Sequence, residues 1–113
     1  MHIKKSEAKE KSNAGTCKVW EYDYPSENMS FATALINGRY PKEKKITNLE
    51  CEQTCFVISG NGKIYTDKGE FELNEGDVYW IKSKEKYYFE GDNLLLALIN
   101  SPKWRLDQHR EVD

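Results

Sequence analysis

Few side chains in this 113-residue chain could act as nucleophiles or bind a metal. There are three cysteines, Cys17, Cys51 and Cys55, and two histidines, His2 and His109. An odd number of cysteines without a C-x-x-C pair indicates reduced thiols in a reducing compartment. On one extended strand Cys51 and Cys55 would stand about 13 Å apart, whereas a disulfide needs Cα atoms within about 7 Å. We therefore expect separate, buried thiols.

Acid, base and nucleophile pairs can be sought among the same residues. A thiol nucleophile needs an activating base, and His109 is the nearest candidate by residue type. Only a tail folded over the site would bring His109 near Cys51 or Cys55, and we do not expect that arrangement. Glu50 and Glu52 could serve as acid or base, but strand alternation is expected to turn them toward solvent.

Arg39 and Tyr40 directly follow a predicted Asn37-Gly38 turn. An arginine fork binds carboxylate or phosphate with two hydrogen bonds, so these residues are candidates for binding an anionic ligand. The alternative is that Arg39 stacks on an aromatic side chain of the fold. The charge run at residues 41–45 is more typical of a solvated loop.

Short strands with glycine-containing turns between them must position these residues. Turn signals include Gly60-Asn61-Gly62 and Gly91-Asp92-Asn93. The pattern predicts an all-β antiparallel sandwich or barrel. The best helix candidates are residues 6–11 and the tail after Pro102, and neither has a convincing helical period. The expected strands are Lys18 to Tyr22, Phe31 to Ile36, Gln53 to Ser59, Lys63 to Thr66, Glu70 to Leu73, Asp77 to Ile81, Lys86 to Glu90 and Leu94 to Asn100.

Length and composition indicate one folded domain, at residues 17–113, after a polar arm at residues 1–16 that could pair as an edge strand. The net charge of -2 gives no general attraction for nucleic acid or an anionic membrane. The longest apolar run, residues 94–99, is far short of the roughly 20 residues that span a bilayer. The first 16 residues lack the apolar stretch of a secretory signal, so we expect a cytoplasmic protein.

The stretch from residue 57 to 81 resembles the central hairpins of the small single-domain cupins. The most specific parts are Ser59-Gly60-Asn61-Gly62, similar to the turn that closes the first cupin motif, and residues 74–78, similar to the start of the second. The resemblance covers roughly residues 31–100 and implies a double-stranded β-helix, a jelly-roll barrel with an open lumen. In typical members two His and a Glu from the first motif and a His from the second hold a divalent metal.

This chain departs from that metal-binding pattern. Residues 38–53 contain no histidine. Counting from the glycine turns, the Glu position of the family falls on Gln53 and the second-motif His position falls on Tyr87. A neutral amide and a phenol with a pKa of about 10 are poor ligands for a divalent cation. We therefore predict no metal and no cofactor.

Strand alternation predicts what lines the lumen instead. With Gln53 turned inward, Cys51 and Cys55 share its face, and Phe89 joins Tyr87. Such a neutral, aromatic pocket suits a small organic ligand. The alternative is a filled barrel in which Gln53 and Tyr87 bond to each other or to water.

Two functions stay open at this point. The first is a metal-free module that binds a small molecule. The second is a metal-independent isomerase or epimerase for a sugar derivative, with Tyr87 as acid or base. Phe56 and Ile58 are expected on the outer face, and the resemblance implies a homodimer that covers them.

Overall fold

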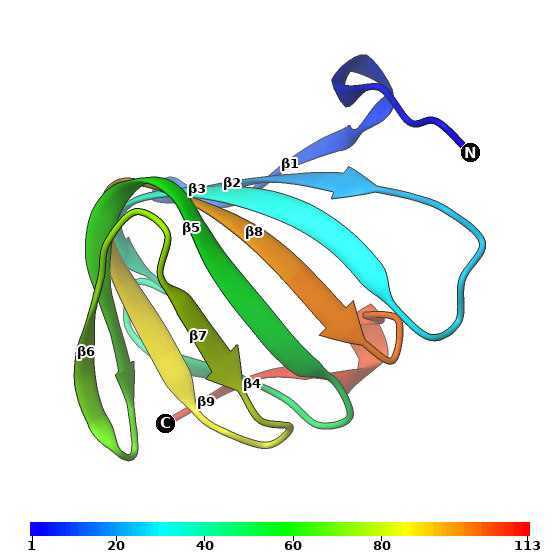
Figure 1. Cartoon of the computed structure of the whole chain (residues 1–113). Helices are drawn as coiled ribbons and strands as arrows, with labels where there is room; N and C mark the ends of the chain where they lie inside the picture. The colour runs from blue at the N-terminus through cyan, green and yellow to red at the C-terminus, as the bar shows by residue number, and fades with distance from the viewer.

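The computed structural model describes all of residues 1–113 as an antiparallel sheet curled into a barrel (Figure 1). The two helices are single 3-10 turns, and no helix is long and apolar enough to cross a membrane. The elements in chain order are η1 Lys5–Glu7, β1 Lys9–Ala14, β2 Cys17–Tyr22, β3 Ser30–Tyr40, β4 Lys45–Asn48, β5 Glu52–Thr66, β6 Gly69–Leu73, β7 Val78–Ile81, β8 Tyr87–Ser101, η2 Leu106–Gln108 and β9 His109–Val112.

The long strands β5 and β8 form the axis of the sheet. They pair from Glu52↔Ser101 to Thr66↔Tyr87. The first half of β5 also pairs with β7 and the second half with β6. On its other side β8 pairs with β3 and, through Tyr87, with β4. The expected all-β barrel is confirmed, and its central strands are twice as long as predicted.

Glycines explain why two pairs of predicted strands are single strands. The segments around Gly60 and Gly91 were expected to be turns, but they lie inside β5 and β8, where the chain comes very close to its neighbours. A Cβ added at Gly60 would lie 1.9 Å from the carbonyl oxygen of Asn93, and one at Gly91 would lie 2.4 Å from that of Ile36. The register of β5 and β8 also shifts beside Ser59. The glycines therefore permit irregular, tightly packed strand centres and do not reverse the chain.

Two strands, β4 and β9, were not predicted, whereas β1 agrees with the expectation that the polar arm could pair as an edge strand. Residues 9–14 of the polar arm form β1, an edge strand that pairs with β2 through contacts such as Glu10↔Trp20. β4 and β9 pair with each other and bring the C-terminal segment back onto the barrel. Residues 6–11, a helix candidate without a convincing helical period, form only the end of a 3-10 turn and the start of β1. These elements lack the alternation on which the prediction relied, because β1 is exposed on both faces and β4 is buried on both.

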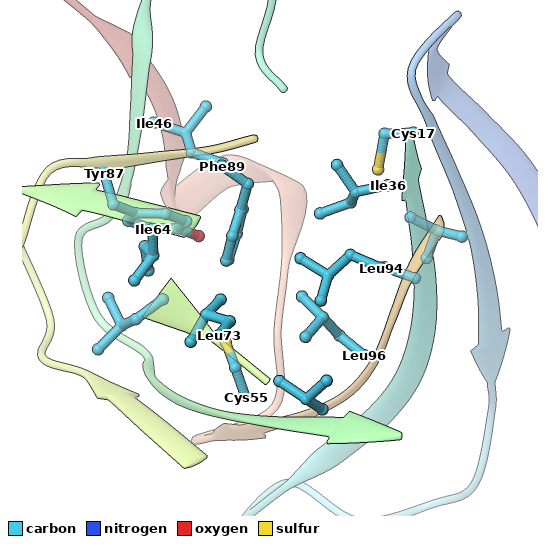
Figure 2. Packing of buried hydrophobic residues seen from close by; sticks show 14 residues of the cluster. Cys17, Ile36, Ile46, Cys55, Ile64, Leu73, Tyr87, Phe89, Leu94 and Leu96 are labelled. Carbon is cyan, nitrogen blue, oxygen red and sulfur yellow. The ribbon is translucent and has the colours of Figure 1, made fainter. Parts of the chain in front are cut away.

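The apolar core lies inside the curled sheet (Figure 2). Alternation along β5 was predicted correctly, since Cys51, Gln53, Cys55 and Val57 are buried while Phe56 is partly exposed. The same holds in β8 for the buried Tyr87 and Phe89. In Figure 2 Leu94 and Leu96 point from β8 toward Ile36 and Cys17, and Tyr87 and Phe89 lie on the opposite side beside Ile64. Side chains fill the interior only in part, because a cavity extends from the core toward the C-terminal segment.

Candidate functional site

A cavity of about 760 Å³ extends from the apolar core to the C-terminal segment. Strands β1, β2, β3, β4, β5 and β8 line it together with side chains from residues 103–111. Its lining includes charged side chains, among them Lys9, Lys42, Glu21, Asp23 and Glu111. It also includes aromatic rings, amides and one imidazole, among them Tyr40, Tyr87, Phe89, Trp104, Asn48, Gln53, Asn100 and His109.

Gln53 and Asn100 form a pair of buried amides in this cavity. They are direct cross-strand partners on β5 and β8, so both side chains project on the same face of the sheet. Their exposed fractions are only 6% and 5%. Gln53 Nε2 donates to Cys55 Sγ at 3.3 Å, whereas Asn100 Oδ1 has no hydrogen-bond partner in the chain. A buried unpaired carbonyl of this kind costs about 1–3 kcal/mol, so the site favours a molecule that donates a hydrogen bond to Asn100.

The two tyrosines of the cavity are neutral phenols. Burial raises the pKa of Tyr40 to about 12. Burial also raises the pKa of Tyr87, and the neighbouring Asn48 amide opposes this only in part. Both hydroxyls therefore keep their protons at physiological pH and can donate hydrogen bonds to a ligand, but neither is a base.

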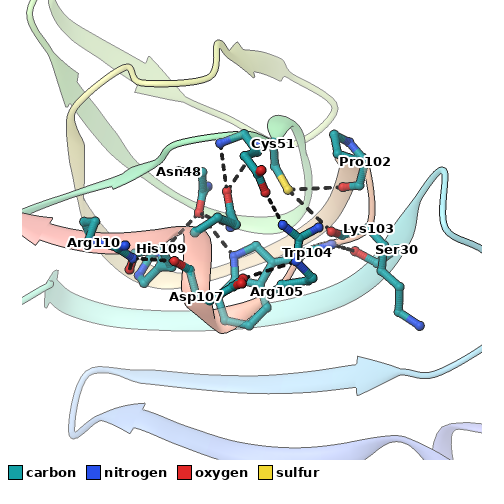
Figure 3. A network of polar contacts seen from close by, with 12 residues as sticks. Ser30, Asn48, Cys51, Pro102, Lys103, Trp104, Arg105, Asp107, His109 and Arg110 are labelled. Atoms are coloured by element: carbon teal, nitrogen blue, oxygen red, sulfur yellow. Dashed lines mark hydrogen bonds and ion pairs between the residues drawn. The ribbon is translucent and has the colours of Figure 1, made fainter.

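The C-terminal segment completes the site, contrary to the expectation that the tail would stay away. β9 pairs with β4 in the register Asn48↔His109, which carries His109 to the cavity. Asn48 Oδ1 lies 3.2 Å from Trp104 Nε1, 3.1 Å from Gln108 Nε2 and 2.9 Å from His109 Nδ1 (Figure 3). Arg105 also pairs with Glu50 on the segment that joins β4 to β5. The polar network therefore ties residues 104–109 to β4.

His109 is held as a neutral ring. Burial lowers the pKa of its imidazole below the ordinary value of 6.5. The carboxylate of Glu111 opposes this shift and the guanidinium of Arg110 adds to it. The ring packs at a tilt against Trp104, with 5.6 Å between ring centres. His109 is thus an uncharged group with one free lone pair at physiological pH.

Four of the seven predicted site residues line the cavity, namely Tyr40, Gln53, Tyr87 and Phe89. The other three, Arg39, Cys51 and Cys55, do not line it. Their surroundings explain why.

The two cysteines are held away from the cavity by their hydrogen bonds and their burial. Cys51 Sγ donates to the carbonyl oxygen of Pro102 at 3.1 Å, which fastens the loop after β8. Cys55 has 0% exposure and accepts its hydrogen bond from Gln53. Burial raises the pKa of the Cys55 thiol to about 12. Both are structural thiols, and neither is an activated nucleophile.

Arg39 stacks on an aromatic side chain, as in the alternative considered from the sequence. Its guanidinium lies 4.0 Å from the ring centre of Tyr88 on the outer side of β8. It donates to the carbonyl oxygens of Lys42 at 2.7 Å and Lys44 at 3.3 Å. These contacts leave Arg39 outside the cavity and occupied with the loop before β4.

The sequence did not reveal four of the cavity residues: Asn48, Asn100, Trp104 and His109. Asn100 could have been found from its register with Gln53, but sequence alone does not give the pairing of strands so far apart. The other three belong to β4 and the tail, which carry no alternation signal.

No protein-family model matches the chain, and no curated protein is significantly similar to it in sequence. Solved structures do match. Pac13 from Streptomyces, described as a unique nucleoside dehydratase, has a TM-score of 0.89 at 14% identity, over 99% of this chain and 90% of Pac13. An RmlC-like cupin from Shewanella frigidimarina has a TM-score of 0.72 at 13% identity, over 90% of this chain and 89% of that one. The chain has the cupin fold.

KdgF from Halomonas sp. is another structural neighbour, with a TM-score of 0.72 at 11% identity, over 90% of this chain and 94% of KdgF. These identities support the fold and nothing finer.

The cavity does not fit the divalent metal of typical cupins. No three His, Cys, Asp or Glu side chains lie together as a metal-binding group. Gln53 and Tyr87 stand at the positions where the cupin resemblance puts ligands, and they offer an amide and a protonated phenol. His109 is the only imidazole in the cavity. A divalent ion needs several anionic or imidazole donors to offset its lost hydration, so this donor set is unsuitable.

Proposed function

We propose that the protein binds a small polar organic molecule, of the size of a nucleoside or sugar derivative, in its barrel cavity and without a metal ion. The observation that carries this proposal concerns Asn100, which lines a cavity of about 760 Å³ beside Gln53 and whose buried Oδ1 has no hydrogen-bond partner in the chain. Ligand sites in proteins commonly have volumes of roughly 300–1,000 Å³.

The chemistry of the walls supports a ligand with a flat ring and several polar groups. Trp104 and Phe89 offer aromatic surface, and the amides and phenols offer both donors and acceptors. The solved structures of Pac13 variants with uridine support a ligand of this size in a barrel of this shape. Lys9 and Lys42 also line the cavity and form no ion pair with a carboxylate, so a phosphate or carboxylate on the ligand could be accommodated there.

Thermal-shift measurements in the presence of EDTA test this proposal. The panel contains uridine, other nucleosides, free sugars, sugar phosphates and organic acids. A compound that binds only the folded protein raises the melting temperature as its concentration increases. Gln53→Leu should weaken the response to the same compound while leaving the melting temperature of the free protein nearly unchanged. If no compound stabilises the protein, the filled-barrel interpretation is favoured.

A second candidate is a metal-independent isomerase or epimerase for a sugar derivative. The observation in its favour is His109, because a neutral imidazole can remove a proton from a substrate. Tyr87 was first considered as acid or base; its raised pKa suits a proton or hydrogen-bond donor and not a base. Turnover of a compound that binds, lost in His109→Gln, would favour this candidate over simple binding.

We further propose a cytoplasmic homodimer. The three cysteines are buried and unpaired, which suits a reducing compartment. On the outer side of the sheet, Val78 faces Phe56 across the ladder, and Trp80 faces Thr54. A second copy would cover this apolar surface, which includes a 59% exposed Val78 at the edge strand.

A further inference from the structure

We propose that Nε2 of His109 is the proton-accepting atom of the cavity, and that the bound molecule donates a hydroxyl or N–H hydrogen bond to it. The inference rests on the proposed function for the ligand contact. Its first half, the state of the ring, concerns the free protein alone.

The orientation of the Gln108 amide is fixed by the backbone. Gln108 Oε1 lies 3.1 Å from the backbone nitrogen of Glu50 and 3.2 Å from that of Cys51. Both nitrogens can only donate, so the atom facing them must be the amide oxygen. Gln108 Nε2 is therefore the atom that faces Asn48.

The orientation of the Asn48 amide follows in two independent ways. Gln108 Nε2 donates to it at 3.1 Å, so the facing atom of Asn48 must accept. The indole Nε1 of Trp104 also points to this atom at 3.2 Å, and an indole N–H can only donate. The shared atom is thus the oxygen Oδ1, which has no hydrogen of its own.

The orientation of the Asn48 amide determines the tautomer of His109. Its Nδ1 lies 2.9 Å from Asn48 Oδ1, and an oxygen that only accepts requires a protonated Nδ1. In a neutral ring the proton on Nδ1 leaves Nε2 with a free lone pair. Asn48 is therefore a positioning residue, and His109 is the group that would contact the ligand. Figure 3 shows Trp104 and His109 gathered around Asn48.

The charged groups around the His109 ring do not favour its protonated, charged form. On β9 the ring has Arg110 and Glu111 as neighbours, with opposite effects on its pKa. In the preceding turn Arg105 is paired with Asp107 and also with Glu50. On the facing strand β4 the only charged residue is Lys45. No carboxylate forms an ion pair with His109, so no anion is placed to hold the imidazolium.

The complementary ligand carries a donor at this position, such as a sugar hydroxyl or the N–H of a nucleobase. The same unprotonated Nε2 of His109 would remove a proton from the substrate in the isomerase alternative.

Nitrogen-15 NMR of the labelled full-length protein tests the ring state directly. The chain has only two histidines, and the exposed His2 serves as the internal reference. At pH 7.5 we expect a His109 ring with its proton on Nδ1 and an unprotonated Nε2. A ring protonated on Nε2, or an imidazolium, would overturn the inference. In Asn48→Asp the new carboxylate should raise the pKa of His109 and keep the proton on Nδ1; an unchanged pKa would show that residue 48 does not contact the ring.

The ligand contact is tested with uridine first, then with whichever panel compound stabilises the protein. On saturation the Nε2 resonance should move while Nδ1 stays close to its free value. Affinity should fall up to tenfold for each pH unit below the pKa of His109, because the imidazolium cannot accept. Binding that is independent of pH would contradict the contact. If no compound binds, the proposed function and the contact fail together, and the tautomer is still decided by the spectrum of the free protein.

Discussion

At the scale of single residues, the site depends on amides and an imidazole whose hydrogen bonds are nearly all supplied by the chain. Asn48 accepts from three side chains, while Asn100 Oδ1 accepts from none. This contrast separates residues that build the cavity from residues that are free to bind. Asn48 belongs to the first group, and Asn100 belongs to the second.

The half-buried, neutral His109 should make stability depend on pH. Its pKa is lowered in the folded protein, so the unfolded chain binds the proton first as the pH falls below 6.5. Its contribution is complete above 6.5 and is lost as the pH falls toward the folded-state pKa. Urea unfolding of wild type and His109→Gln between pH 7.5 and 5 measures this. Wild type should lose more unfolding free energy over this range than the variant; equal losses would show that the ring is solvated.

Tyr87→Phe should weaken ligand binding without disturbing the barrel. The phenol is a buried donor, and removing one neutral hydrogen bond costs about 0.5–1.5 kcal/mol, or roughly a two- to twelvefold change in affinity. Isothermal calorimetry with a stabilising compound provides the measurement. Arg39→Lys is the matched control. Arg39 lies outside the cavity, so its substitution should leave the ligand affinity unchanged. A loss in the control alone would move the site to the outer surface near Arg39.

Four cavity residues could be predicted from the sequence because they lie on β3, β5 and β8, whose alternation is regular. Gln53 and Phe89 were placed correctly by that rule. His109 was missed because no sequence feature near residue 109 predicts that β9 pairs with β4. Arg39 was expected at the site on its chemistry alone, which says nothing of the side of the strand on which it projects.

At the scale of elements, the bent centres of β5 and β8 decide the shape of the cavity. These strands stay paired past their irregular middle only because glycines let the backbones approach closely. The sequence marks the same glycines as turns, since Gly-Asn-Gly has the composition of a turn. A glycine within a continuous strand cannot be told from a turn without knowing which backbone lies against it.

Gly91→Ala should destabilise the protein strongly. Its new Cβ would lie 2.4 Å from the carbonyl oxygen of Ile36, a backbone atom that cannot rotate away. Overpacking of this kind typically costs about 1–3 kcal/mol. Chemical denaturation of the purified variant gives the change in unfolding free energy. Gly15→Ala is the control, with only the end of the Lys42 side chain nearby at 3.5 Å. Equal stability of the two variants would contradict the close approach of β3 and β8.

At the scale of the whole molecule, the all-β barrel could be predicted because short amphipathic strands and frequent glycines leave few other folds. The outer face was also predicted from alternation, through Phe56 and Ile58. What covers that face is a proposal. Val78, Phe56 and Ala97 lie side by side across three strands, so the apolar surface is continuous there.

Val78→Asp should convert the proposed dimer into a monomer. The residue lies on β7 with 59% of its surface exposed, so the fold should tolerate the change while an apolar interface would not. Sedimentation velocity gives the molecular mass. Leu49→Asp is the control, because Leu49 is 39% exposed and lies beside the C-terminal segment, where its backbone N–H donates to the carbonyl oxygen of Gln108. A monomeric wild type, or a dimer that survives Val78→Asp, would contradict this interface.

The most direct test of a metal-free ligand site is a titration of the nitrogen-15-labelled protein in EDTA, followed through the side-chain amide signals of Gln53 and Asn100. We predict that at least one nucleoside or sugar derivative shifts both signals in a saturable way while elemental analysis finds no bound metal. Binding that appears only after a divalent cation is added, or about one tightly held metal ion per chain, would contradict the account.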